Sequence, residues 1–391
     1  MKEYLSSFGP SPSGRLGGAI YIHIPFCKQA CNYCDFHFSI STKYKTEMIL
    51  AIVRELEMRK DEFQNEIVES IYFGGGTPSI LDISQIKLLL DTAFLNYNIC
   101  KNPEITLEAN PDDLSENVLI ALSQTKINRL SIGVQSFFEK DLTFMNRAHN
   151  SQQAKECLQL ATTYFKNISV DLIYGIPGLS NEEWKQNIQT AINFGISHIS
   201  SYALTVEPKT ALQKLIATGN AAAPSDETAL EHFEILVETL ENNGFIHYEL
   251  SNFGKPDYFS QNNSSYWLGK KYIGVGPSAH SFDRNSRSWN VANNSLYIKS
   301  ITNNELPSQT EQLSVSDSYN EYVMTGLRTI WGVSLDKVAT DFGEKYKKYL
   351  QKMSVKFIEQ NLIFLENNIL KTTKKGKFLI DGIASDLFYI E

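Results

Sequence analysis

Residues 20–34 read IYIHIPFCKQACNYC, in which a short β-branched run leads directly into three closely spaced cysteines. The run has the composition of a buried strand. Cys27, Cys31 and Cys34 then share the loop that follows the carboxyl end of that strand. In folds made of parallel strands and helices, such loops carry the active groups. This stretch therefore predicts both the class of fold and the place of its chemistry.

The alternation of short β-branched runs with longer helical stretches continues along the chain. Apolar residues recur at three- and four-residue spacing over Lys45–Glu62, Ser84–Phe94 and Asn181–Phe194, as in helices that cover a sheet. The pattern predicts an α/β fold whose parallel strands form a barrel or an open barrel. The expected strands are Ile20–Ile24, Ser70–Phe73, Glu104–Ala109, Arg129–Val134, Ser169–Tyr174 and His198–Leu204.

Composition and charge narrow the class of protein. The chain has 391 residues, of which 42% are hydrophobic and 20% charged, and this indicates a globular protein of about two or three domains. The formal net charge of -8 argues against a nucleic-acid surface, because phosphate binding needs concentrated positive potential. No apolar run reaches secretory or membrane-spanning length, so we expect a cytoplasmic protein without a transmembrane segment.

The sequence pattern also suggests how the chain is divided. Residues 1–18 are rich in Ser, Gly and Pro, which predicts a flexible leader. The alternating pattern then covers 19–299, and the mainly helical sequence of 300–391 predicts a second, smaller domain. In that domain Asn367 and Asn368 separate two apolar runs, which is a hairpin signal typical of the wing in a winged helix.

The cysteines indicate a metal site rather than a disulfide framework. There are five, an odd number, and Cys100 and Cys157 stand far from the cluster of three. Structural zinc could take His37 as a fourth ligand and form a closed Cys3His site. An iron–sulfur cluster held by three thiolates instead leaves one iron open for a cofactor. The local residues leave both kinds of site possible.

The CxxxCxxC spacing resembles the signature of radical S-adenosylmethionine (SAM) enzymes. From Tyr21 to about His280, and more loosely beyond, the sequence resembles the oxygen-independent coproporphyrinogen dehydrogenase superfamily of radical SAM proteins. The resemblance implies a partial (β/α)6 TIM-like radical SAM barrel followed by a smaller, mainly helical, winged-helix-like C-terminal domain. The further segments that carry it are YFGGGTPS at 72–79, EANP at 108–111, Gln135–Phe137, Asn146–Arg147 and Asp171–Gly175.

The resemblance also implies two cofactors. Cys27, Cys31 and Cys34 would ligate a [4Fe–4S] cluster. Glycine loops admit a ligand close to the backbone, carboxylates accept hydrogen bonds from ammonium or hydroxyl groups, and an arginine can hold a carboxylate. No catalytic residue is assigned. The residues expected to contact SAM are Tyr21, Gly75, Gly76, Thr77, Glu108, Gln135, Arg147, Asp171, Ala203 and His280.

Within this superfamily, the sequence is more similar to the HemW-type haem chaperones than to the dehydrogenase. Phe36 gives the CxF form of the cysteine motif that the chaperones have, where the dehydrogenase has CxC. Only 26 residues precede Cys27, so we expect little room for the longer N-terminal extension of the dehydrogenase. The segments His247–Phe253 and Tyr266–Trp267 resemble chaperone segments beside the haem-contact region.

One position departs from the chaperone pattern. The family motif HNxxYW appears here as NNSSYW, so Asn262 stands where the family has histidine. Asparagine cannot replace imidazole as an iron ligand, which leaves another histidine, Tyr266 or apolar burial alone to hold haem. Neighbours on a strand face opposite sides, so Tyr266 and Trp267 could line one pocket only outside a strand. The possible haem contacts are Asn263, Tyr266 and Trp267.

The resemblance implies a haem chaperone that binds a [4Fe–4S] cluster, SAM and haem and transfers haem to an acceptor protein. An electron donor such as a flavodoxin or ferredoxin would be a further partner. The alternative is an oxygen-independent coproporphyrinogen III dehydrogenase, which carries out a SAM-dependent oxidative decarboxylation in porphyrin biosynthesis. A third hypothesis is that the three thiols bind a structural zinc ion. Whether the protein is an enzyme therefore stays open at this point.

Overall fold

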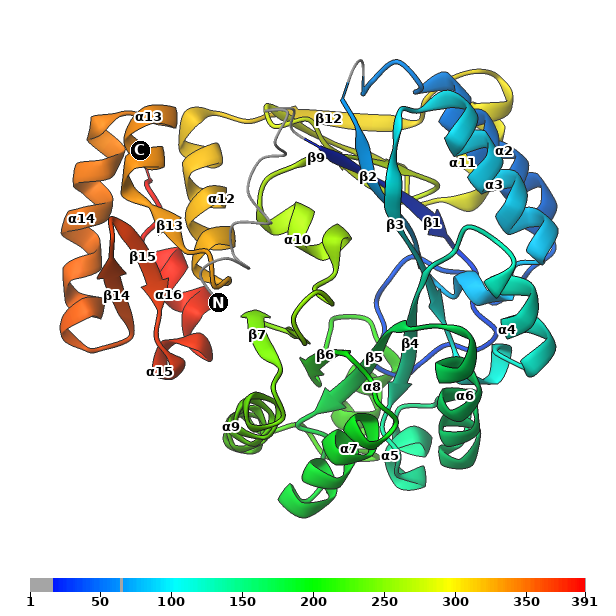
Figure 1. Ribbon diagram of the computed structural model, residues 1–391, viewed down its shortest axis with the longest axis horizontal. Helices are drawn as coiled ribbons and strands as arrows, with labels where there is room; N and C mark the ends of the chain where they lie inside the picture. Colours follow the sequence, from blue (N-terminus) through cyan, green and yellow to red (C-terminus); the bar gives the residue numbers. More distant parts are fainter. Residues whose placement is uncertain (1–16, 64–65, 391) are drawn as a thin grey trace.

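The computed structural model describes residues 17–63 and 66–390. A curved sheet, with helices along its outer face, makes up most of the molecule, and a smaller helical group with its own sheet lies beside it (Figure 1). The leader expected over residues 1–18 falls almost wholly outside the described residues. Its last residue, Gly18, was assigned wrongly, because it already begins the first strand of the sheet.

All six strands expected from the sequence are present. They lie side by side in chain order and each pair is parallel, which confirms the predicted βα arrangement. Helices cover the outer face, so the inner strand β4 is buried along its whole length, as inner strands of parallel sheets generally are. The strands are β1 (Gly18–Ile24), β2 (Val68–Gly75), β3 (Ile99–Ala109), β4 (Arg129–Gln135), β5 (Asn167–Tyr174) and β6 (His198–Ala203).

The helices between these strands bury one apolar stripe each against the sheet. On α2 this stripe includes Met48, Ile52 and Leu56, at the three- and four-residue spacing of a covering helix. The three helices expected from the sequence, α2, α3 and α7, are confirmed. The helices of this region are α2 (Lys45–Met58), α3 (Ile83–Asn96), α4 (Glu116–Ser123), α5 (Glu139–Phe144), α6 (Ser151–Tyr164), α7 (Asn181–Asn193), α8 (Ala211–Ala217) and α9 (Asp226–Asn242), with short 3-10 turns at Pro78–Ile80 and Pro111–Asp113.

The sheet is larger than the sequence predicts, because it has twelve strands. At one edge, β6 is followed by antiparallel β8 (Asn252–Gly254) and β7 (Ile246–Glu249). At the other edge, β9 (Lys271–Val275) runs parallel to β1 and leads into an antiparallel extension. That extension consists of β10 (His280–Phe282), β11 (Ser286–Asn290) and β12 (Ser308–Gln312), with α10 (Gln261–Trp267) before β9 and α11 (Asn294–Thr302) between β11 and β12.

The extension changes where the first domain ends. β12 pairs with β11 over its whole length, so the large sheet continues past residue 300, where the sequence pattern suggested a boundary. The sequence SQTEQ of β12 gave no strand signal, because every residue of this edge strand is exposed and none is apolar. We propose that the boundary lies after Gln312.

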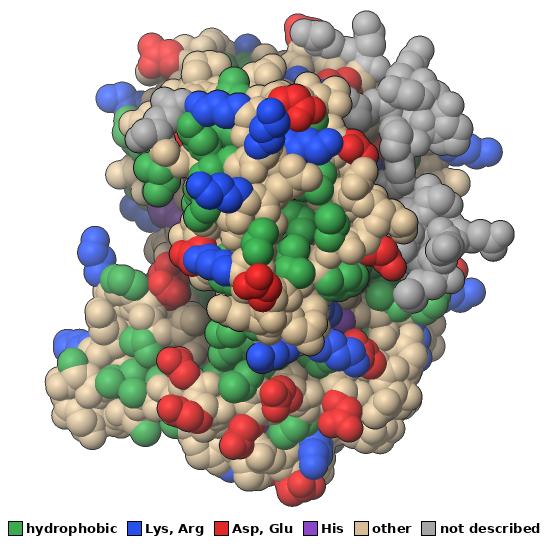
Figure 2. Space-filling model, turned by 90° about the vertical axis from the view of Figure 1, so that its left-hand side faces the viewer, with side chains coloured by type: hydrophobic (Ala, Val, Ile, Leu, Met, Phe, Trp, Pro, Cys, Tyr) green, Lys and Arg blue, Asp and Glu red, His purple; other side chains and the backbone are tan. Residues whose placement is uncertain are grey.

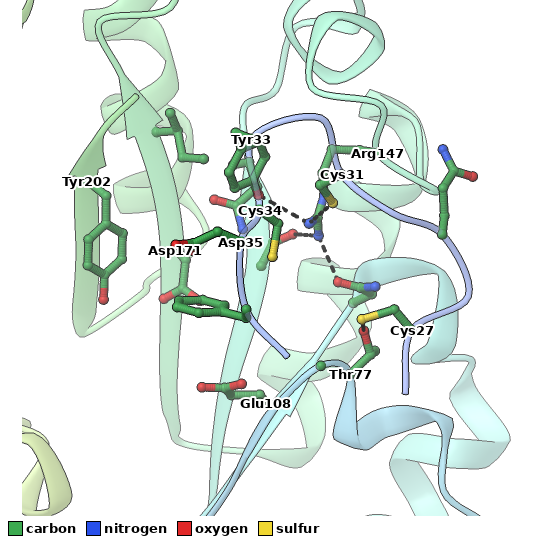
Figure 3. A pocket seen from close by; sticks show the side chains of 18 of the residues that line it. Cys27, Cys31, Tyr33, Cys34, Asp35, Thr77, Glu108, Arg147, Asp171 and Tyr202 are labelled. Atoms are coloured by element: carbon green, nitrogen blue, oxygen red, sulfur yellow. Dashed lines mark hydrogen bonds between the residues drawn. The ribbon is translucent and has the colours of Figure 1, made fainter. Parts of the chain in front are cut away.

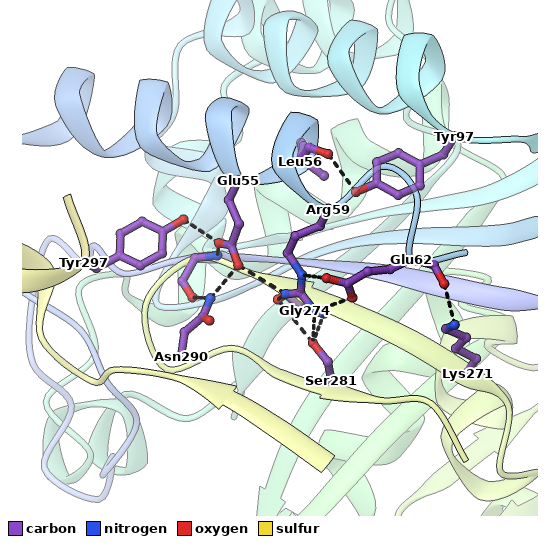
Figure 4. A network of polar contacts seen from close by, with 11 residues as sticks. Glu55, Leu56, Arg59, Glu62, Tyr97, Lys271, Gly274, Ser281, Asn290 and Tyr297 are labelled. Atoms are coloured by element: carbon purple, nitrogen blue, oxygen red, sulfur yellow. Dashed lines mark hydrogen bonds and ion pairs between the residues drawn. The ribbon is translucent and has the colours of Figure 1, made fainter. Parts of the chain in front are cut away.

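A buried polar network fastens the extension to α2 (Figure 4). The Glu55 carboxylate, fully withdrawn from solvent, accepts hydrogen bonds from Tyr297 Oη at 2.6 Å, Asn290 Nδ2 at 2.8 Å and Gly276 N at 2.8 Å. Arg59 pairs with the same carboxylate at 3.1 Å. A buried charge is tolerated only when it is fully paired in this way, so the network fixes β9, β11 and α11 relative to α2.

The C-terminal domain has its own hydrophobic core, which contains Tyr319, Val338, Leu350 and Leu370. Its hairpin turns at Asn367 and Asn368, whose φ angles of 51° and 61° suit a two-residue hairpin loop, and this confirms the predicted turn. The elements are α12 (Val315–Leu327), β13 (Val333–Ser334), α13 (Leu335–Asp341), α14 (Glu344–Glu359), β14 (Ile363–Glu366), β15 (Ile369–Thr372), α15 (Lys374–Lys377) and α16 (Ile380–Asp386).

Helices followed by a three-stranded sheet, in the order β13-β15-β14, agree with the expected winged-helix-like form. Figure 2 shows the side of the molecule that this domain occupies, where hydrophobic side chains lie among Lys and Arg side chains. Among the described residues, none of the helices combines the length and the apolar composition needed to cross a bilayer.

Candidate functional site

A cavity of about 580 Å³ opens at the carboxyl ends of the parallel strands, and all three clustered cysteines line it (Figure 3). The cysteine loop follows β1, and the side chains opposite come from the ends of β2 to β6. Parallel strands all end at the same edge of the sheet, so residues far apart in the sequence meet here. The structure therefore brings the predicted cysteine site and most of the predicted SAM residues to one pocket.

The cysteine loop is held by the segment that follows α5. Asn32 donates from its backbone to Met145 O at 3.0 Å and from its side chain to Phe144 O at 2.8 Å. In return, Asn146 Nδ2 donates to Ala30 O at 2.7 Å. These paired contacts fix the loop that carries the thiols. Pre-positioned ligands reduce the conformational entropy lost when a metal group binds.

The thiols stand in a partly desolvated setting with few hydrogen-bond donors. Burial raises the pKa of Cys34 to about 11, and burial also raises the pKa of Cys27, although the Thr77 hydroxyl donates to Cys27 Sγ at 3.4 Å. Cys31 Sγ accepts from Arg147 at 3.2 Å. Metal binding requires thiolates and itself drives the loss of their protons. The three cysteines are therefore better suited to bind a metal group as thiolates than to remain free thiols.

The geometry favours a cluster over a closed zinc site. His37, the expected fourth zinc ligand, points its Nε2 to Asn294 Oδ1 at 2.7 Å instead of joining the cysteines. In the described part of the chain, no three His, Cys, Asp or Glu side chains gather closely enough to hold a single metal ion. An iron–sulfur cluster is wider than one ion, so its cysteine ligands need not gather as closely, and all three cysteines line the same cavity.

The glycine loop after β2 packs against the cysteine loop. Gly75 has a φ of +109°, and a Cβ there would lie 2.7 Å from the His23 ring. A Cβ on Gly76 would lie 2.5 Å from Phe26 O. Any side chain at these positions would push the two loops apart, so the glycines are needed for the shape of the pocket. Close approach of a ligand to this backbone stays a prediction.

Two part-buried carboxyl groups face the pocket. Glu108 accepts from Tyr72 Oη at 2.7 Å, and burial raises its pKa to about 7. Burial likewise raises the pKa of Asp171 to about 6, although Ser131 Oγ lies 3.4 Å from it. A desolvated carboxylate is stabilised by a positive or hydrogen-donating ligand. This pair is therefore suited to a ligand that carries ammonium or hydroxyl groups.

Arg147 contributes mainly to the wall of the pocket. Its Nη2 donates to Asn110 Oδ1 at 2.7 Å and to Gly133 O at 2.8 Å, while Nη1 reaches Cys31 and Tyr33. Its Nε is buried without a partner among the described residues. The expectation that Arg147 holds the SAM carboxylate stays a prediction, and the orphaned Nε–H is the donor group that a ligand would satisfy.

Most of the expected SAM residues line the pocket, and two do not. Tyr21 lies deeper in the barrel. His280 lines neither barrel cavity, because on β10 its exposed ring stacks on Trp289 at 6.1 Å. The eight that line the pocket are Gly75, Gly76, Thr77, Glu108, Gln135, Arg147, Asp171 and Ala203.

A smaller polar chamber of about 220 Å³ lies further inside the barrel and shares Glu108 and Asp171 with the pocket. Asn263 and Tyr266 line it. Trp267 instead packs against Arg328, whose guanidinium carbon lies 5.7 Å from the ring centre. The three possible haem contacts thus fall in two places, because they lie on the helix α10 rather than on a strand or a loop.

Sequence reasoning missed several pocket residues. Tyr33 lies between two of the cysteines and bonds Arg147, so its position in the motif was an available signal. Ser131 and Gly133 alternate with apolar residues on β4 and face the pocket. A small or polar residue at every second position of an otherwise apolar strand is the pattern that could have found them. Tyr202, at the end of β6, had no such signal.

Comparison with known proteins adds family relationships. The Radical SAM superfamily matches residues 21–191, and the HemN C-terminal domain matches residues 313–379. The chain is 32% identical to "Heme chaperone HemW" of Lactococcus lactis, over 93% of this chain and 97% of that protein. It is 33% identical to the protein of the same name from Bacillus subtilis, over 92% of this chain and 96% of that protein.

A solved structure supports the architecture. Coproporphyrinogen III oxidase (HemN) from Escherichia coli, described there as a radical SAM enzyme, matches with a TM-score of 0.82 and covers 99% of this chain and 93% of that chain. The identity is 20%, so this likeness concerns the fold alone. It confirms the predicted α/β barrel with an additional C-terminal region.

Proposed function

The chain belongs to the HemW family of radical SAM proteins, and from this premise we propose that it is a haem chaperone that binds haem and passes it to an acceptor protein. The observation that carries the proposal is the alignment of nearly the whole chain, including the C-terminal domain, with relatives that bear this name. A cytoplasmic location is part of the same proposal.

We further propose that the barrel pocket holds a [4Fe–4S] cluster and SAM. Cys27, Cys31 and Cys34 would bind the cluster, which when reduced supplies one electron. Support comes from the three thiols on one fixed loop and from the absence of a gathered zinc ligand set among the described residues. Glu108 and Asp171 would accept from the positive and hydroxyl groups of SAM, because both line the pocket and desolvation raises the pKa of each carboxyl.

Phe36 supports the chaperone over the dehydrogenase. It occupies the position of the last cysteine in the CxC form of the motif, and its side chain is 68% exposed at the mouth of the pocket. A phenyl ring cannot ligate metal, so at this place the chain keeps only three sulfur ligands. An electron donor of the flavodoxin or ferredoxin kind is the further partner that a redox-active cluster would need.

The test is an anaerobic reconstitution of the full chain with iron and sulfide, followed by a haem titration with and without SAM. We expect about four irons and four sulfides per chain and saturation near one haem per chain. Visible absorption follows haem, and elemental analysis follows the metal. One zinc with no iron or sulfide would overturn the cluster. Conversion of coproporphyrinogen III with release of 5′-deoxyadenosine, without saturable haem binding, would overturn the chaperone in favour of the dehydrogenase.

A further inference from the structure

A second cavity, of about 360 Å³, lies where the β7–β8 edge of the large sheet meets the C-terminal domain. We call it the junction cavity. Ile330 N donates to Tyr248 O at 3.0 Å, and Glu249 forms a β-bridge with Thr329, so the two domains are in direct contact there (Figure 1). Cavities between domains are common binding sites, and this volume lies within the usual range for small ligands.

The most unusual group in the junction cavity is the part-buried ammonium of Lys377. It donates to His247 Nδ1 at 2.7 Å, while His247 Nε2 donates to Leu250 O at 3.0 Å. A ring that donates from one nitrogen and accepts at the other is neutral. Burial and the nearby Lys377 lower the pKa of His247 well below its usual value. The ammonium therefore has a neutral partner, and among the described residues it forms no ion pair.

The other charges of the junction cavity add to this excess of positive charge. The cavity is lined by Arg328, Lys371, Lys374 and Lys377, against two acids, Glu241 and Glu249. Lys374 pairs with Glu241. Burial raises the pKa of Glu249 to about 7, so this carboxyl carries only part of its charge near neutrality.

Two of the cations also have partners outside the cavity. Arg328 pairs with Asp381 at 2.7 Å and Lys371 with Glu366 at 3.0 Å, and both acids are exposed. Exposed ion pairs contribute little free energy, so these cations can turn to a ligand at low cost. Lys377 has no ion pair among the described residues, so it can bind a ligand without giving one up.

The remaining lining is apolar. Leu250, Phe259, Leu327, Ile330 and Ile380 form most of it, and Phe364 stands at the surface with 37% exposure. A cavity with cations beside an apolar lining selects a ligand with a hydrophobic body and carboxylate groups. Haem has this chemistry, since its macrocycle is apolar and two propionates project from one edge.

We propose that the junction cavity receives the propionate edge of the haem cargo, with Lys377 as the anchoring cation and Lys371, Lys374 and Arg328 around it. This inference rests on the proposed function. Arg328 also lies over the Trp267 ring, so the tryptophan of the family's haem motif belongs to this side of the molecule. His247, Glu249 and Leu250, from the segment that resembles the chaperones beside the haem-contact region, line the same cavity.

The two barrel cavities are poorer places for these carboxylates. The large pocket has four acids, Asp35, Glu108, Asp171 and Glu207, against the single cation Arg147. Even with Glu108 only partly ionised near neutrality, the acids outnumber the cation, so the pocket repels a dianion. The inner chamber has about 220 Å³, and its one cation, Arg129, already lies 3.9 Å from Glu104. Charge and size therefore both favour the junction cavity.

The experiment compares ferric haem with its dimethyl ester, in which both propionates are esterified. Both are titrated into the full-length, cluster-reconstituted protein, the Lys377→Met variant and a matched control, Lys375→Met. Lys375 is exposed, lies on the same short helix and does not line the cavity. The Soret band reports binding, and far-UV circular dichroism checks that each variant is folded.

We expect Lys377→Met to weaken haem binding about tenfold or more, because a hydrogen bond between charged groups is lost. Binding of the ester should be the same in both proteins, and Lys375→Met should bind haem as the wild type does. A second variant, Lys371→Met, should weaken haem about two- to fivefold, since this cation has another partner.

Three outcomes would overturn one or both of these statements. If the wild type binds haem and Lys377→Met and Lys371→Met bind it equally well, the inference is wrong while the proposed function stands. If the wild type shows no saturable haem binding, the proposed function falls and this inference falls with it. Equal weakening of haem and ester by Lys377→Met would also overturn the inference, because the effect would then not depend on carboxylates.

Discussion

The barrel pocket and the junction cavity carry opposite excesses of charged side chains. Four acids and one arginine line the pocket, whereas three lysines and an arginine, with two acids, line the junction cavity. SAM carries a sulfonium and an ammonium group against one carboxylate and is cationic overall, whereas haem carries two carboxylates. Buried charges attract ligands of opposite sign more strongly than exposed ones, because the local dielectric is low. The difference indicates that one chain can keep a cationic cofactor and an anionic cargo apart.

The two sites also differ in construction. The pocket is formed by loops at the ends of neighbouring parallel strands, whose spacing the sheet fixes. The junction cavity is formed between two domains, whose contacts include the Ile330 N–Tyr248 O hydrogen bond, the Lys374–Glu241 pair and the packing of Phe378 on Phe233. A site on one rigid sheet suits a resident cofactor, and a site between domains suits a cargo that has to leave.

The largest expected effect is the loss of the cluster from the barrel pocket without loss of haem binding at the junction cavity. Replacing Cys27, Cys31 and Cys34 together by Ala should abolish cluster loading, because no sulfur ligand remains in the pocket. Haem binding at the junction should stay within about twofold of wild type, since none of these residues lines that cavity. Iron, sulfide and haem are measured on the same samples.

Cys100→Ala and Cys157→Ala serve as controls and should load iron and sulfide as the wild type does, because both cysteines lie away from the pocket. Iron and sulfide retained by the triple variant would contradict the assignment of the cluster. Loss of haem binding together with the cluster would instead show that the two sites are not separate.

Removing one buried charge from the pocket should have the next largest effect. Glu108→Gln should weaken SAM binding about tenfold at pH 8, measured by calorimetry on the reconstituted protein. With a pKa of about 7, Glu108 becomes ionised between pH 6 and pH 8. Wild-type affinity for SAM should therefore rise over this interval, and the variant should lack that rise.

The control for this measurement is Glu47→Gln, which removes an exposed carboxylate on α2. It should bind SAM with wild-type affinity and wild-type pH dependence. An unchanged pH profile in Glu108→Gln would show that the Glu108 carboxylate does not face the cofactor.

The sequence predicted the pocket better than the junction cavity for a physical reason. Glu108, Gln135 and Asp171 lie on strands that the β-branched runs identify, and parallel strands bring their ends together. The junction cavity depends on contacts between His247 and Lys377, which are far apart in the sequence and belong to different domains. No periodicity or motif reports such docking.

The opposite charges should also give opposite pH dependences of stability. The pKa of Lys377 is lowered by burial to about 8, so between pH 8 and about 10 the unfolded chain binds more protons and wild-type stability rises with pH. The pKa of Glu108 is raised, so between pH 4.5 and 7 the folded chain binds more protons and stability falls as pH rises.

Denaturant unfolding of wild type and Lys377→Met at pH 7 and pH 10 measures the first of these effects. The wild type should gain about 2 kcal/mol relative to the variant over this interval, from the shift in pKa. Lys375→Met should track the wild type at both pH values. Equal changes in wild type and Lys377→Met would mean that the Lys377 ammonium is fully solvated or already neutralised.

The strands β11 and β12 show why part of the fold could not be predicted from the sequence. β11 and β12 read SRSWN and SQTEQ, which together contain one apolar residue, and neither is among the strands expected from the sequence. They form a ladder with β10, so backbone hydrogen bonds rather than apolar burial hold them. A pattern of hydrophobic side chains cannot report strands that contain almost no apolar residues.

The smallest expected effect concerns the hairpin that carries one wall of the junction cavity. Asn368 has a φ of 61° in the β14–β15 turn, and Lys371 follows on β15. Asn368→Gly should stabilise the C-terminal domain by about 0.5 kcal/mol, because glycine adopts this conformation without a steric penalty and Asn-Gly is the preferred pair. The loss of the Asn368 contact with Asp336, 3.3 Å long and exposed, should cost less than this gain. Hydrogen exchange of β14 and β15 is the measurement, with haem affinity expected to stay at the wild-type value. Faster exchange in the variant would mean that the asparagine side chain, and not the backbone conformation, holds the turn.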